Sequence, residues 1–64
     1  MNVDEVKRWV DDIRADKDPE TAHGSEDDLY ASVLRAVAHG HPDATEMARI
    51  ALTTKQLDFP RWCA

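Results

Sequence analysis

The sequence lacks residues that several classes of small protein depend on. Its 64 residues include one cysteine, two glycines and only four aromatic side chains. A single cysteine cannot form an internal disulfide, which excludes the disulfide-stapled scaffolds common among small secreted domains. Two glycines are too few for a glycine-rich phosphate-binding loop. The longest uninterrupted apolar runs contain three residues, so the sequence predicts no membrane-spanning helix.

Basic residues are also scarce in the first part of the chain. Residues 1–28 hold four Lys or Arg against ten carboxylates, a balance of −6, whereas residues 29–64 have a balance of +1. An acidic half repels nucleic acid and anionic lipid, so we expect neither as a partner. It suits a partner with a basic surface or mimicry of nucleic acid, or it serves as a solvated face that keeps the chain soluble. Asp4 and Glu5 occupy the place of a basic signal region, and we expect a cytoplasmic protein.

Apolar periodicity predicts a first amphipathic helix over residues 3–17. Its apolar residues recur at helical spacing within an arc of about 120°, and they are Val3, Val6, Trp9, Val10 and Ile13. Asn2 is a suitable N-cap. Pro19 disfavours helical backbone at Asp18, so we expect the helix to end there and residues 18–25 to form a connector.

Two further helices are predicted, over residues 26–39 and 42–53. Ser25 with Asp28 matches a capping pattern that opens the first of them, and Gly40 is the expected left-handed stop. Pro42 suits the first turn of the next helix. Their stripes comprise Leu29, Tyr30, Val33, Leu34 and Val37, and then Ala44, Met47, Ala48, Ile50, Ala51 and Leu52. No segment alternates with a period of two, so the predicted fold is a single all-α domain, a small three-helix bundle.

A tail over residues 54–64 completes the domain. The stripes are rich in Ala and Val, which leaves a small core. Leu57, Phe59 and Trp62 are therefore expected to fold back over the helices, beside Trp9, with Asp58 able to cap a single turn. If they do not fold back, they expose an apolar patch that favours self-association.

Residues 23–64 resemble a known family. The EDDL…VLRA block and the terminal DFPRWCA are similar to those of short uncharacterised proteins found in actinobacteria and in the bacteriophages that infect them. That family has no assigned activity, so the resemblance implies no catalytic residue. It implies a small cytoplasmic accessory protein, encoded by a phage, in which the aromatic tail is a defining part.

A second resemblance lies within residues 23–64. Residues 33–52 are similar to the first two helices of winged helix-turn-helix regulators, in which a glycine-containing turn precedes a helix with Glu-x-Ala. A DNA-binding regulator built from residues 33–57 is therefore the alternative function. It would need a basic recognition helix, and the residues that follow, TTKQLDFPRW, are short and contain Pro60. Any helix–turn–helix with small residues near its turn produces the same match.

The sequence gives little support for a metal-binding or catalytic site. His23, His39, His41 and Cys63 could be assembled as a zinc ligand set, but their spacing is irregular. Dipole and capping roles explain His39 and His41 without a metal. Cys63 would need a neighbouring base to act as a nucleophile. We therefore expect no enzyme, no metal and no cofactor.

The sequence favours a non-enzymatic helical accessory protein that acts through protein–protein interaction. Its partner would be another protein or a second copy, as a homodimer. The tail combines aromatic residues with an arginine, a composition typical of interface anchors. The predicted first helix presents charged residues to solvent, among them Glu5 and Arg8. The candidate contact residues are Trp9, Asp12, Asp16, Phe59, Arg61 and Trp62.

Overall fold

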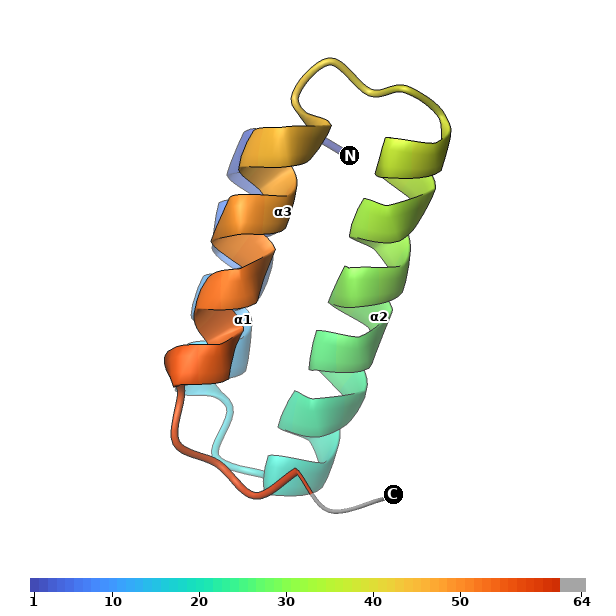
Figure 1. Cartoon of the computed structure of the whole chain (residues 1–64). Helices are drawn as coiled ribbons and strands as arrows, with labels where there is room; N and C mark the ends of the chain where they lie inside the picture. The colour runs from blue at the N-terminus through green and yellow to red at the C-terminus, as the bar shows by residue number, and fades with distance from the viewer. Residues whose placement is uncertain (62–64) are drawn as a thin grey trace.

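The computed structural model describes residues 1–61 and confirms a small all-α three-helix bundle (Figure 1). Helix α1 (Val3–Ala15), helix α2 (Pro19–Ala38) and helix α3 (Ala44–Leu52) are followed by a 3₁₀ turn, η1 (Thr53–Gln56). Figure 1 shows α3 in front of α1, with α2 beside both and antiparallel to α3. Within residues 1–61, no helix is long and apolar enough to span a membrane.

Each helix contributes an apolar face to one core. The buried apolar side chains are Val6, Val10, Ile13, Ala22, Leu29, Val33, Met47 and Ala51. Most of them are Val or Ala, as the stripes predicted, so each buries little area. Leu57 and Phe59 pack against this core from the tail, which confirms the predicted fold-back for these two residues. Trp9 also packs on the core.

The prediction of a connector over residues 18–25 was wrong. Helix α2 begins at Pro19, with the Asp18 carboxylate accepting from the Glu20 N–H at 3.0 Å. Proline suits the first helical position because it has no N–H to leave unpaired. Pro19 thus starts α2 immediately after ending α1, and the connection is only residues 16–18. Ser25, predicted as the cap, lies inside the helix.

The other helix ends differ from the prediction by a few residues. Helix α1 stops at Ala15 because Asp16 adopts extended backbone, and its carboxylate accepts from the Asp18 N–H at 2.9 Å. Helix α3 begins at Ala44 rather than at residue 42, since Pro42 and Asp43 form a turn before it. Gly40 has a φ of +71°, so the predicted left-handed stop is confirmed.

Leu34, Val37 and Leu52 were predicted to belong to the core and do not. They are 67%, 50% and 60% exposed, which makes them the most exposed large apolar side chains among residues 1–61. At 100° per residue, Leu34 and Leu52 lie at the edges of their stripes, and the described part of the chain supplies no fourth helix to cover them. The predicted core therefore included side chains on one side of the bundle that the structure leaves exposed.

The two glycines provide a test of the early start of α2. Gly24 lies in α2 with nothing within 4 Å of an added Cβ, so Gly24→Ala should raise the free energy of unfolding by about 0.5–1 kcal/mol. Gly40→Ala is the matched control, and its positive φ should make it destabilising by about 1–2 kcal/mol. Urea unfolding followed by circular dichroism measures both. No gain at Gly24 would show that residues 19–25 are not helical in solution.

Candidate interaction surfaces

One carboxylate is almost completely buried in this small bundle. Glu26 of α2 is 1% exposed, and both of its oxygens accept hydrogen bonds from Arg61. The Arg61 Nε lies 2.9 Å from Glu26 Oε1, and a terminal nitrogen lies 3.2 Å from Oε2. This forked pairing matches the planar geometry of guanidinium and carboxylate. It ties the tail to the first half of α2 across 35 residues of sequence.

Arg61 also binds the backbone of the segment that leads to it. One terminal nitrogen donates to the Thr54 carbonyl at 2.6 Å and to the Leu57 carbonyl at 3.2 Å. The guanidinium lies over the Phe59 ring, 3.9 Å from its centroid. We call these five residues, Glu26, Thr54, Leu57, Phe59 and Arg61, the arginine clamp. The clamp gives Phe59 and Arg61 a structural role, in addition to any contact they make with a partner.

The clamp sets the ionisation of Glu26. Burial alone raises the pKa of the Glu26 carboxyl, but the Arg61 guanidinium and the Thr54 hydroxyl outweigh that effect and hold the pKa below its ordinary value of 4.5. A second carboxyl, Asp16, has its pKa lowered chiefly by a hydrogen bond from the Thr21 hydroxyl. Asp16 thus acts locally, closing the α1–α2 connection, and it does not join the other predicted contact residues.

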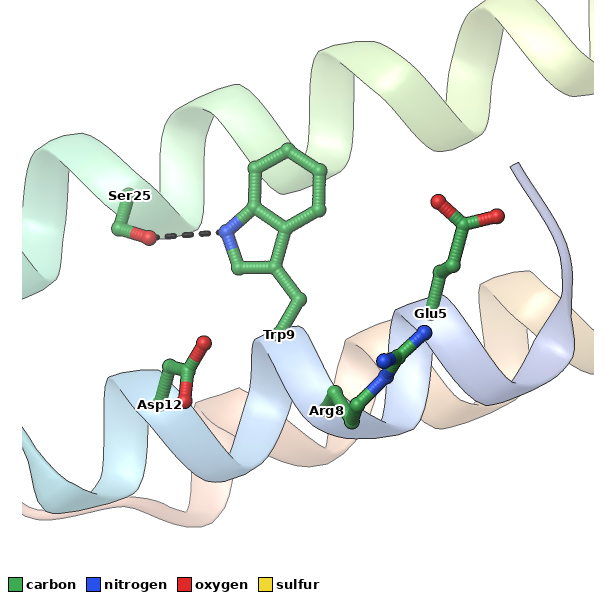
Figure 2. Close-up of a pocket in the computed structure, with 5 residues that line it drawn as sticks. All are labelled: Glu5, Arg8, Trp9, Asp12 and Ser25. Atoms are coloured by element: carbon green, nitrogen blue, oxygen red, sulfur yellow. Dashed lines mark hydrogen bonds between the residues drawn. The ribbon is translucent and has the colours of Figure 1, made fainter.

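Trp9 and Asp12 are brought together at a shallow depression on the seam between α1 and α2 (Figure 2). The Trp9 indole Nε1 donates to the Ser25 hydroxyl at 2.8 Å, and Glu5, Arg8 and Asp12 line the rest. Figure 2 shows the indole reaching across to α2 while the charged side chains project from α1. The role of Ser25 was missed because its position had suggested a cap. Trp62, the remaining predicted contact residue, lies outside the described residues.

A second surface, whose lining is almost wholly apolar, was not predicted from the sequence. It is a groove of about 310 Å³ between α2 and α3, lined by Tyr30, Val33, Leu34, Ala48, Ala51 and Leu52. We call it the α2–α3 groove. Its only polar lining group, the Tyr30 hydroxyl, is hydrogen-bonded to the Thr54 hydroxyl, and Lys55 lies 5.5 Å from the centre of the Tyr30 ring. The signal that could have found it is the position of Leu34 and Leu52 at the edges of their stripes.

The histidines do not converge on one place. His23 pairs with Asp27 in the first half of α2, while His39 and His41 follow the other end of that helix. Sixteen residues of helix between His23 and His39 correspond to about 24 Å. His41 accepts from the Asp43 N–H through Nδ1 and therefore donates through Nε2 to the Met1 carbonyl at 2.9 Å. Among residues 1–61, no three His, Cys, Asp or Glu side chains form a metal-binding group.

Breaking the clamp should destabilise the fold. Arg61→Ala leaves Glu26 buried without its cation, and we expect the free energy of unfolding to fall by about 3 kcal/mol. Arg61→Lys keeps the charge but not the fork, so it should lose less. The double variant Glu26→Leu/Arg61→Met leaves no buried charge and should recover about half of the Arg61→Ala loss. Urea unfolding measures all three. Equal stability of Arg61→Ala and the parent would show that the clamp does not form in solution.

The clamp also predicts acid sensitivity. Because folding lowers the pKa of Glu26, its contribution to stability is complete above the unfolded value of 4.5 and is lost as the pH falls through the lower folded value. Asp16 adds to the same trend. Unfolding by urea between about pH 3 and 7 should show a steeper acid loss for the parent chain than for Glu26→Gln. Glu26→Gln should be the less stable of the two at pH 7. Parallel profiles would contradict the role of Glu26.

Comparison with known proteins assigns the chain to no family. No protein-family model matches the chain, and no significant match was found among curated proteins or solved structures. The resemblance of residues 23–64 to short actinobacterial and phage proteins therefore stays a prediction from the sequence. The surfaces described above are the basis for inferring function.

Proposed function

We propose that the chain is a non-enzymatic helical interaction protein that binds a protein partner through the α2–α3 groove. The observation that carries this proposal is the exposure of Leu34 and Leu52, 67% and 60%, on the two walls of one apolar groove. Covering each leucine would stabilise a complex by about 1–2 kcal/mol. A contiguous apolar patch of this kind on a small protein is typical of interaction sites.

The polar residues support a structural rather than a catalytic assignment. Both oxygens of the buried carboxylate of Glu26 are occupied by Arg61, so it is not free to accept a proton from a substrate. Ser25 accepts the Trp9 N–H and Tyr30 bonds to Thr54. These groups hold helices together.

The groove determines the kind of partner. Its lining consists of aliphatic side chains and Tyr30, whose hydroxyl is already bonded to the Thr54 hydroxyl, so the partner surface would be apolar, such as the apolar stripe of a helix. The Trp9 depression lies on the seam between α1 and α2, away from this groove, and Glu5 and Asp12 make it a secondary contact for basic side chains. We therefore place the main contact with the partner on α2 and α3, and not on the tail, where the sequence had predicted it.

The source and location remain part of the proposal. The resemblance of residues 23–64 favours a phage-encoded accessory protein acting in the cytoplasm of an actinobacterial host. The alternative DNA-binding regulator gains no support from the geometry. After α3, the described chain contains only the 3₁₀ turn η1, and Arg49, the sole basic residue of α3, is paired with Glu46. A recognition helix needs free basic and polar side chains.

Partner capture should depend on the groove. With the tagged chain as bait in a lysate of the host, the captured protein should be lost with Leu34→Glu, because a carboxylate would enter an apolar contact. Lys7→Gln is the matched control, since it makes the same change in net charge on the exposed surface of α1. Mass spectrometry identifies what each bait retains. The same proteins on all three baits would contradict a role for the groove.

A further inference from the structure

The net charge of the molecule is concentrated at one end of the bundle. Residues 16–28 form the α1–α2 connection and the first half of α2, at the lower end in Figure 1, and they hold six carboxylates and Lys17, a balance of −5. Lys55, Asp58 and Arg61 lie at the same end, where Arg61 pairs with Glu26, so the balance there is −4 out of the net −5 of the whole chain. The opposite end holds the α2–α3 turn, with Arg35, His39 and His41 near it. The α2–α3 groove lies between these two ends.

Resting on the proposed function, we propose that the partner of the α2–α3 groove is a second copy of this chain, related by a two-fold axis perpendicular to the helices. In a two-fold contact the same surface meets itself, so that surface must be self-complementary. The groove meets this condition because both of its walls are apolar, with Leu34 exposed on α2 and Leu52 exposed on α3. The axis reverses the direction of the helices but keeps each wall on its own side, so α2 packs on α2 and α3 on α3. Leu34 and Leu52 of one copy then each approach their own counterpart in the other.

Charge favours this arrangement over a parallel one. A perpendicular two-fold axis makes the two copies antiparallel, so the acidic end of one lies beside the α2–α3 turn of the other. The two acidic ends are then separated by most of the 32 Å length of the molecule, well beyond the Debye length of about 8 Å at physiological salt. The charges next to the groove are balanced as well, since Arg49 pairs with Glu46. A contact between two acidic ends would be repulsive.

The overall dimensions of the molecule leave room for a dimer interface. A specific interface at the small end of the range buries about 600 Å² on each partner, which is about one seventh of the 4360 Å² surface of this chain. The two larger dimensions of the molecule, 32 and 20 Å, enclose an area of that order. Two such faces, each formed by an antiparallel pair of helices, would pack as a four-helix layer with Leu34, Val37 and Leu52 covered.

The mass in solution tests the inference. Sedimentation velocity from about 5 µM to 1 mM should show the parent chain approaching twice 7.2 kDa as the concentration rises. Leu34→Glu should weaken the association by about 100-fold or more, since the two-fold axis introduces the carboxylate twice. Leu52→Gln, a neutral change at a residue that is 60% exposed, should weaken it as well. Lys7→Gln has the same net charge as Leu34→Glu and should associate like the parent.

Each outcome decides the question. Circular dichroism should show unchanged helix content in all variants, because Leu34 and Leu52 are mostly exposed in the single chain. A parent chain of single-chain mass at every concentration overturns the inference, and so does a dimer that both groove variants leave intact. A monomeric parent that still captures a different protein in a Leu34-dependent way overturns the dimer alone. A monomer with no Leu34-dependent capture overturns the proposed function as well.

Discussion

The ion pair between Glu26 and Arg61 is the interaction on which the rest of the structure depends. A buried carboxylate is costly unless its charge and its lone pairs are matched, and Arg61 supplies both requirements through its fork. The same guanidinium binds the Thr54 and Leu57 carbonyls and stacks on Phe59. One side chain therefore fixes η1, the tail and the first half of α2 relative to one another. An apolar residue at position 26 would give the tail no such register.

The clamp also explains which part of the apolar surface is covered and which part is exposed. Phe59 and Leu57 cover the core near the clamp, so these two apolar residues of the tail are used inside the single chain. Within residues 1–61, Leu34, Val37 and Leu52 have no comparable cover. The chain thus completes its core on one side and leaves an apolar groove on another. A small core made mainly of Val and Ala makes this division costly unless the groove is occupied in the functional state.

Local patterns predict much of the fold but little of the site. The α1 stripe, the stop at Gly40 and the absence of strand patterns were sufficient for the three-helix prediction. Pro19 was ambiguous, because proline both ends one helix and suits the start of the next. Local patterns did not single out Glu26, since its burial depends on an arginine 35 residues away that no local pattern links to it. Leu34 and Leu52 could not be assigned without knowing how many helices cover them.

The long reach of the clamp has a consequence for the order of folding. Most contacts in a helical bundle are local and form quickly, but Glu26 acquires its cation only when residue 61 is present. During synthesis the nascent chain can form α1 and much of α2 while Glu26 still requires water around its carboxylate. The interior next to it is less stable until the tail arrives. Chains broken off before Arg61 would therefore open more often, and be more accessible to proteases, than chains that include it.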